Sequence, residues 1–163
     1  MKTLLIVHHT MTGGTLQMAQ AAAAGAATEP AVQVRLVHAT QAHAVDVLAA
    51  DGFIFATPEN LAAISGLMKD FFDRTYYPAL DRVNGFPYAS LICAGSDGNN
   101  AARQIDRIAT GWRLKLVAPA LIVCTRAQTP EDILRPKQIA AQELQRCHEL
   151  GAAMATGMAL GIY

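Results

Sequence analysis

The beginning of the chain, residues 1–27, has the pattern of a buried strand, a short loop and a helix, and it limits the possible folds more than any other stretch. Residues 4–7 (Leu-Leu-Ile-Val) form a continuous apolar run, which is typical of a strand buried on both faces. Residues 16–24 are rich in alanine and other good helix formers. Because strands buried on both faces belong to sheets that helices cover on each side, this stretch predicts an α/β protein.

The loop at residues 9–15 carries threonines and glycines and ends at the predicted helix. Hydroxyl donors, a glycine backbone and a helix N-terminus together suit a phosphate group. The loop has no lysine and no Gly-x-Gly-x-x-Gly spacing, so neither common nucleotide-binding pattern is present. A monophosphate held by neutral donors is the simplest interpretation, although an ordinary strand-to-helix connection would use the same threonine cap and glycine bend. The candidate donors are the hydroxyls of Thr10, Thr12 and Thr15 and the amides at Gly13 and Gly14.

Length, charge and cysteine usage narrow the class of protein. A length of 163 residues is typical of a single domain. Hydrophobic residues make up 52% of the chain and charged residues 16%, which fits a sheet covered by helices on both faces. Equal numbers of basic and acidic residues, 13 each, give no reason to expect a nucleic acid or a membrane as partner. Cys93, Cys124 and Cys147 are widely spaced in apolar segments, so we expect reduced core thiols, no metal site and a cytoplasmic protein without a targeting segment.

Further apolar runs alternate with helical patterns along the rest of the chain. This alternation predicts a parallel sheet with helical crossovers, in the strand order 2-1-3-4-5. We expect strands at residues 32–37, 53–56, 88–93 and 120–124, and helices at residues 42–50, after a Ser65 cap, at residues 102–112, and in a long final helix with Pro136 in its first turn.

Three of the predicted strands end in polar or glycine-rich loops, at residues 9–15, 57–61 and 94–98. In a doubly wound sheet, ligands bind at the carboxyl ends of the strands, where the strand order reverses. The order 2-1-3-4-5 makes these three loops neighbours. They therefore predict one site, in which a phosphate cradle is flanked by two loops that hold a flat ring.

The chain resembles a known family in two of these stretches. The run Thr10-Met11-Thr12-Gly13-Gly14-Thr15 resembles the Ser/Thr-x-Thr-Gly-x-Thr phosphate loop of flavodoxins. Residues 52–58 (Gly-Phe-Ile-Phe-Ala-Thr-Pro) and 68–75 (Met-Lys-Asp-Phe-Phe-Asp-Arg-Thr) resemble the flavodoxin-like NAD(P)H-dependent FMN and quinone reductases, including the tryptophan-repressor-binding-protein group. The resemblance implies a flavodoxin-like three-layer sandwich with a five-stranded parallel sheet, and a single FMN-binding domain over residues 1–163.

The resemblance also implies where FMN would lie. The phosphate would contact the loop at residues 10–15, one side of the isoalloxazine would contact residues 58–61, and its pyrimidine edge or the ribityl chain would contact residues 95–98. The aromatic residue that often follows the proline in the reductases is missing here, and the third loop lacks the long glycine-histidine stretch of the tetrameric quinone reductases. The implied contacts are Thr10, Met11, Thr12, Gly13, Gly14, Thr15, Pro58, Glu59, Asn60, Leu61, Gly95, Ser96, Asp97 and Gly98.

The function that this resemblance implies is an FMN-dependent oxidoreductase that passes electrons from NAD(P)H to a quinone or a similar small-molecule acceptor. Because the redox chemistry belongs to the cofactor, no catalytic side chain is required. The resemblance does not decide whether the protein forms a homodimer, and it does not decide between NADH and NADPH.

Two other functions compete with this one. A flavodoxin-type electron carrier would have the same fold, but such carriers are typically acidic and cover the flavin with aromatic residues, which this chain lacks. A serine hydrolase is suggested by Ser96 in a Gly-x-Ser-x-Gly-like corner, although Ala94 replaces the first glycine and His148 lies on the predicted final helix. A phospho-receiver domain, which shares the strand order, is a third possibility that the sequence disfavours, because it would need acidic residues where this chain has His8-His9 and Thr57.

Overall fold

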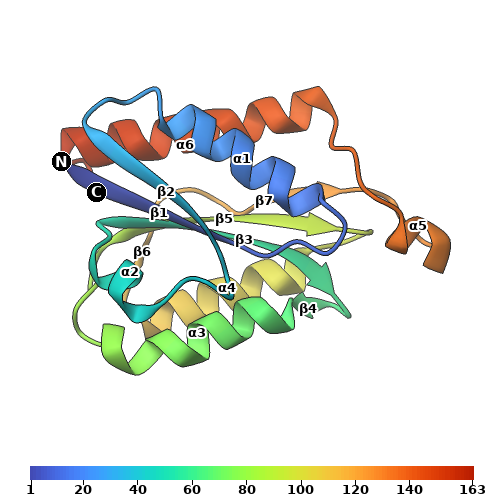
Figure 1. Ribbon diagram of the computed structural model, residues 1–163, viewed down its shortest axis with the longest axis horizontal. Helices are drawn as coiled ribbons and strands as arrows, with labels where there is room; N and C mark the ends of the chain where they lie inside the picture. Colours follow the sequence, from blue (N-terminus) through green and yellow to red (C-terminus); the bar gives the residue numbers. More distant parts are fainter.

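A central sheet lies between two layers of helices in the computed structural model, which describes residues 1–163 (Figure 1). The strands are β1 (Lys2–His8), β2 (Val32–His38), β3 (Gly52–Asn60), β4 (Ala63–Ile64), β5 (Pro87–Ala94), β6 (Lys115–Leu116) and β7 (Leu121–Cys124). The helices are α1 (Gly14–Ala26), α2 (Ala44–Leu48), α3 (Gly66–Ala79), α4 (Asn99–Gly111), α5 (Pro130–Leu134) and α6 (Ala141–Leu160). Helices α1 and α6 cover one face of the sheet, and α3 and α4 cover the other.

The strand order is β2-β1-β3-β5, with β6 and β7 sharing the fifth position beside β5. These neighbours are all parallel, so the predicted order 2-1-3-4-5 is confirmed, with the fifth strand in two pieces. Strand β6 pairs with the beginning of β5 and β7 with its end. Pro119 lies between the two pieces, and a proline cannot donate a ladder hydrogen bond.

Alternate residues of the central strands belong to two separate cores. Leu4 and Ile6 pack toward α1 and α6, whereas Leu5 and Val7 pack on the opposite face with the aromatic side chains of that layer. Trp112, at the end of α4, packs edge to face against Phe53 and buries nearly all of its surface. Burial on both faces accounts for the apolar runs that made these strands predictable.

The backbones of α1 and α6 touch at two glycines. A Cβ atom on Gly25 would lie 1.9 Å from the carbonyl oxygen of His148, and one on Gly151 would lie 1.9 Å from the carbonyl oxygen of Ala22. Each glycine therefore faces the backbone of the other helix, and no side chain fits between them.

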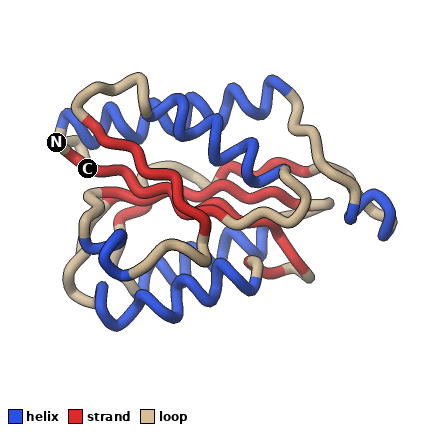
Figure 2. The backbone as a smooth tube through the Cα atoms, viewed as in Figure 1, coloured by secondary structure: helices blue, strands red, loops and turns tan.

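The predicted start of the final helix is wrong. Helix α6 begins at Ala141, and Pro136 lies in an extended stretch before it. A proline in the first turn, which was expected for the final helix, is found instead in the short helix α5. There Pro130 follows Thr129, whose side chain caps the helix. Figure 2 shows the extended stretch as a loop that runs from α5 to α6. Its Lys137 amide donates to the carbonyl oxygen of Thr12, which holds the stretch in place.

The hairpin of β3 and β4 was not predicted. Strand β3 continues through the expected loop to Asn60, and β4 returns antiparallel to it. The two turn residues, Leu61 and Ala62, both have positive φ angles, of 50° and 59°. Such two-residue turns normally contain Asn-Gly or Asp-Gly, so this sequence carries no hairpin signal. Non-glycine residues with positive φ store backbone strain, which is most often found at functional sites.

Two smaller expectations have different outcomes. Ser65 caps α3 as predicted, with its hydroxyl accepting from the Met68 amide at 3.3 Å. Tyr76 packs on the core at the end of α3, but Tyr77 beside it is exposed. Cys124 is also exposed, against the expectation of a core thiol. No helix is both long enough and apolar enough to cross a membrane.

Candidate functional site

A cavity of about 510 Å³ opens at the carboxyl ends of β1, β3, β5 and β7. This volume is in the range of small-molecule and cofactor sites. The cavity brings the three predicted loops together, as the strand order required. The predicted site residues that line it are Thr10, Met11, Thr12, Gly14, Thr15, Pro58, Glu59, Asn60, Leu61, Gly95 and Ser96.

Three predicted site residues do not line this cavity. Gly13 and Gly98 have positive φ angles, of 89° and 83°, and form the N-caps of α1 and α4. Asp97 accepts a hydrogen bond from Asn99 and lines a separate, polar groove beside α4. These glycines shape the turns into the helices, and their role is therefore conformational in this structure.

The first wall of the cavity is the loop before α1. Thr15 is only 1% exposed, and its hydroxyl has no oxygen or nitrogen partner in the protein; its neighbour is the Cys93 thiol, a weak hydrogen-bonding group. A Cβ atom on Gly14 would lie 2.7 Å from the Cys93 sulfur, so a larger residue would have to displace the Cys93 side chain. The N-cap residue of α1 supplies no side-chain hydrogen bond to the first turn. An unpartnered hydroxyl and uncapped amides at a helix N-terminus fit an anion such as a phosphate.

Cys93 forms the floor beneath this loop. Burial raises the pKa of its thiol above the usual value. The side chain is therefore neutral at pH 7 and places no negative charge under the anion cradle.

The second wall is the hairpin of β3 and β4. Asn60 ties it to the first loop, since its side-chain nitrogen lies 3.0 Å from the Met11 sulfur. One carboxylate oxygen of Glu59 is buried without a partner. Leu61, at the tip of the turn, is fully exposed, and Met11 is exposed as well. This wall offers an apolar rim and one unpartnered acceptor.

The third wall was not predicted. It consists of Thr125, Ala127, Ile133, Leu134 and Lys137, from the segment between β7 and α6. The rule that ligands bind at the carboxyl ends of strands could have indicated the residues directly after β7. Nothing in the sequence places α5 or Lys137 beside a loop that precedes them by more than a hundred residues.

Lys137 brings a positive charge to a cavity for which only neutral donors were expected. Its ammonium group donates to the carbonyl oxygens of Asp132, Ile133 and Arg135, at 2.7, 2.8 and 2.7 Å. These bonds satisfy the carbonyls at the end of α5. The lysine therefore holds the third wall together, and its three protons are all used.

Gln17 connects the first and third walls. Its side-chain nitrogen donates to the carbonyl oxygens of Gly13 and Lys137, at 3.0 and 2.8 Å, and its side-chain oxygen accepts from the Ile139 amide at 3.1 Å. One glutamine thus joins two segments that are far apart in the sequence.

Three histidines cluster beside the first loop, outside the cavity lining. The ring of His38 meets those of His8 and His9 edge to face, with centroids 5.3 and 5.6 Å apart. His8 and His9 are both buried, and neither lines the cavity. Burial and then the neighbouring His38 and His9 lower the pKa of His8 to about 4, and burial and His38 lower the pKa of His9. No group of three or more potential ligands in the structure has the geometry of a metal site.

This cluster predicts a loss of stability in acid. Unfolded, His8 takes up a proton near its ordinary pKa of 6.5, whereas in the fold it stays neutral down to about pH 4. The stabilisation is complete above pH 6.5 and is lost as the pH falls toward 4, by about 3 kcal/mol. Denaturant unfolding at pH steps from 8 to 4 measures this slope. We expect a flatter slope for His8→Gln; equal slopes for wild type and His8→Gln would contradict the prediction.

Two curated proteins are similar in sequence to this chain. A flavodoxin from Aquifex aeolicus (strain VF5) is 41% identical over 96 residues, covering 59% of this chain and 50% of the relative. An NAD(P)H dehydrogenase (quinone) from Acidithiobacillus ferrooxidans (strain ATCC 53993 / BNL-5-31) is 34% identical over 95 residues, covering 46% of this chain and 48% of the relative. The chain thus spans about half the length of the curated relatives it matches.

The fold is also found among solved structures. The crystal structure of a flavodoxin, WrbA-like protein from Agrobacterium tumefaciens superposes with a TM-score of 0.75 over 99% of both chains, at 18% identity. At this level of identity the likeness concerns the fold, which is flavodoxin-like as predicted.

The family is shown by a match to the sequence model for NADPH-dependent FMN reductases, over residues 38–131. This segment is more than half of the chain and contains the β3–β4 hairpin and the loop after β5. The first loop precedes it, so the assignment of the phosphate cradle depends on the geometry described above. The chain belongs to the NADPH-dependent FMN reductase family.

Proposed function

We propose that this protein binds FMN in the cavity and passes electrons from NAD(P)H to a quinone or a similar small molecule. The observation that carries the proposal is the unpartnered hydroxyl of Thr15, buried in a glycine-built cradle at the N-terminus of α1. This cradle forms one wall of a cavity whose other walls would hold a flat ring. Membership of the FMN reductase family supports the same cofactor.

The phosphate of FMN would be held by the first loop. Thr10 accepts from the Gly13 amide at 3.0 Å, so its own hydroxyl proton is free to donate to a ligand. Thr12 and Thr15 line the same part of the cavity. The amides of Met11 and Gly14 would complete a set of donors that needs no cationic side chain.

The ring would lie between the hairpin and the loop after β5. Bound FMN supplies the redox chemistry, because it accepts electrons from a reduced nicotinamide and passes them to an acceptor. The residues of this chain bind, orient and exclude water. Glu59 offers an acceptor for a ring N–H, and the apolar side chains of Leu61, Ile133 and Leu134 form the rim.

The alternative of a flavodoxin-type carrier is favoured by one observation, the 41% identity to a flavodoxin. The reductase is favoured by the zero net charge and by the wall composition, since no aromatic side chain lines the cavity to cover the ring. A ring face without such a cover leaves room for a nicotinamide to stack.

The hydrolase alternative has no support in the geometry. Ser96 lines the cavity, but no histidine does. His148 lies on α6, and the buried pair His8 and His9 faces His38. A serine without a neighbouring base is not an activated nucleophile.

Titration of the purified protein with FMN, followed by absorbance and flavin fluorescence, tests the cofactor. We expect one FMN per chain and FMN-dependent oxidation of NADH or NADPH when a quinone is added under anaerobic conditions. A protein that binds FMN without oxidising either nicotinamide would be a carrier. Failure to bind FMN at saturating concentration would overturn the proposal.

A further inference from the structure

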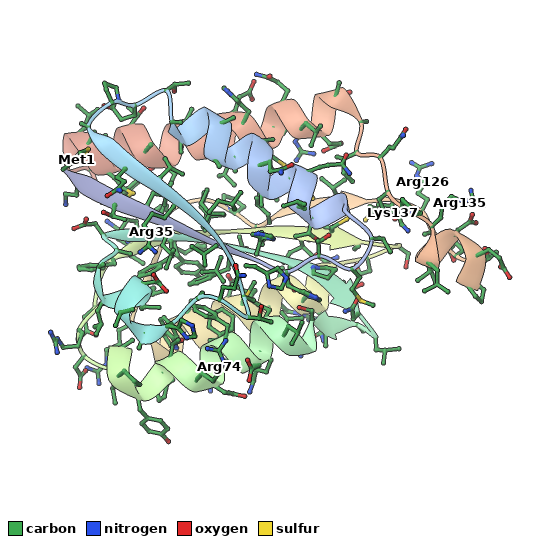
Figure 3. All side chains as sticks on the ribbon, in the orientation of Figure 1. Met1, Arg35, Arg74, Arg126, Arg135 and Lys137 are labelled. Atoms are coloured by element: carbon green, nitrogen blue, oxygen red, sulfur yellow. The ribbon has the colours of Figure 1, made fainter.

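An exposed arginine next to the third wall of the cavity has no role in the site described so far. Arg126 follows β7, and its neighbours Thr125 and Ala127 both line the cavity. Figure 3 labels Arg126, Arg135 and Lys137 at the same end of the molecule, beside α5. The end of the cavity beside α5 therefore carries a group of cations that comes from one short segment.

Arg126 is the member of this group whose charge is not engaged. Arg135 forms an ion pair with Asp132 at 3.3 Å, and the ammonium of Lys137 donates to three carbonyls. The guanidinium of Arg126 is exposed and takes part in no hydrogen bond or ion pair of the structure. Glu131 and Asp132 on α5 offset part of the charge of the group.

The backbone of Arg126 is held in a strained conformation. Its φ angle is 59°, in the left-handed region that residues other than glycine and asparagine rarely adopt. The preceding Thr125 is fixed by its amide and hydroxyl, which both donate to the carbonyl oxygen of Ala94, at 2.8 and 3.1 Å. Strain of this kind persists where the surroundings impose it, and it is concentrated at ligand sites.

The charge of Arg126 suits a phosphate ester, and two phosphate esters would come near it. The phosphate of FMN would bind in the cradle at the N-terminus of α1, which contains the buried hydroxyl of Thr15, and so does not need Arg126. NADPH differs from NADH by one dianionic phosphate on its adenosine half, which would remain outside when the nicotinamide covers the ring. Arg126 is exposed just outside the cavity lining, where the second ligand would extend, and a planar guanidinium binds phosphate through paired hydrogen bonds.

We infer that Arg126 is a specificity-determining residue that binds the adenosine phosphate of NADPH and selects NADPH over NADH. This inference rests on the proposed function, because it needs a nicotinamide to react at the cavity. Arg135 and Lys137 add to the positive field, and Arg126 makes the direct contact.

The test is the Arg126→Gln variant, assayed with both nicotinamides. We expect kcat/KM for NADPH to fall about 10- to 100-fold, as for a lost hydrogen-bonded charge pair, while kcat/KM for NADH stays within twofold. The matched control is Arg113→Gln, since Arg113 is also exposed and has a φ angle of 57° but pairs with Asp81 and is not next to residues that line the cavity. Arg113→Gln should change neither value.

A binding measurement separates this inference from the proposed function. Calorimetry measures the affinity of the protein for adenosine 2′,5′-bisphosphate and for adenosine 5′-monophosphate, with and without FMN. The difference between the two affinities reports the contribution of Arg126 whether or not FMN binds. We expect tighter binding of the bisphosphate to the wild type and no such preference in Arg126→Gln. Equal binding of the two ligands to the wild type would overturn the inference, and so would an Arg126→Gln variant that loses affinity for FMN but not for riboflavin.

Discussion

We expect the Thr12→Glu variant to bind FMN at least about 1000-fold more weakly than the wild type. A carboxylate at this position would lie in the cradle that the phosphate occupies in the proposed complex. Two like charges about 4 Å apart near a protein surface repel by about 4 kcal/mol, and this energy corresponds to roughly three orders of magnitude in Kd. Titration of flavin fluorescence measures the change.

Riboflavin, which has the same ring without the phosphate, is the matched ligand. Its affinity should be nearly unchanged in Thr12→Glu, because the repulsion acts on the phosphate alone. Thr28→Glu, at the other end of α1, adds the same charge away from the cavity and should bind FMN normally. Equal losses of FMN and riboflavin would indicate a damaged fold, and retained tight FMN binding would place the phosphate elsewhere.

Thr15→Val provides a milder form of the same experiment. Valine has nearly the shape of threonine, and the hydroxyl that it removes has no oxygen or nitrogen partner within the protein, only the weakly bonding Cys93 thiol beside it. Folding should therefore be little affected, while FMN loses one hydrogen bond to a charged group, which is worth about 10-fold or more in affinity. Unchanged FMN binding in this variant would remove the observation on which the proposed function depends.

The parts of the fold that could be predicted are those that depend on local patterns. Buried parallel strands appear as continuous apolar runs, and the run at residues 4–7 is buried on both faces as expected. The first loop was predictable as the connection between β1 and α1, because its glycines and threonines suit a turn before a helix N-terminus. That this loop binds a phosphate stays a prediction. The topological rule then brought three loops to one edge, and the cavity lies there.

The parts that could not be predicted depend on contacts between distant segments. The hairpin of β3 and β4 turns at Leu61 and Ala62, whose side chains give no turn signal, and its strain is offset by the surrounding contacts. The third wall is positioned by Gln17, whose three hydrogen bonds cannot be inferred from a glutamine in a helical pattern. Asp97 was expected at the site because of its loop, but a bond to Asn99 turns it away.

The Gly25→Ala variant should destabilise the protein by about 3 to 5 kcal/mol, although alanine is normally the better helix former. The added Cβ atom would lie 1.9 Å from the carbonyl oxygen of His148, which belongs to the backbone of α6 and cannot turn aside. The two helices would have to separate along their length, and the contacts of Ala22 and Met154 in the shared core would loosen. Denaturant unfolding gives the free energy directly.

The control for this prediction is Gly111→Ala, at the end of α4. A Cβ atom there would meet nothing within 4 Å, and the φ angle of this glycine is not positive, so the usual helix preference should apply and stabilise the protein by up to about 1 kcal/mol. The same chemical change thus has opposite signs at two positions in helices, because only one of them faces another backbone. A neutral or stabilising Gly25→Ala would show that α1 and α6 are farther apart than this structure places them. Since the proposed phosphate cradle lies at the first turn of α1, Gly25→Ala should also weaken FMN binding more than riboflavin binding, whereas Gly111→Ala should leave both unchanged.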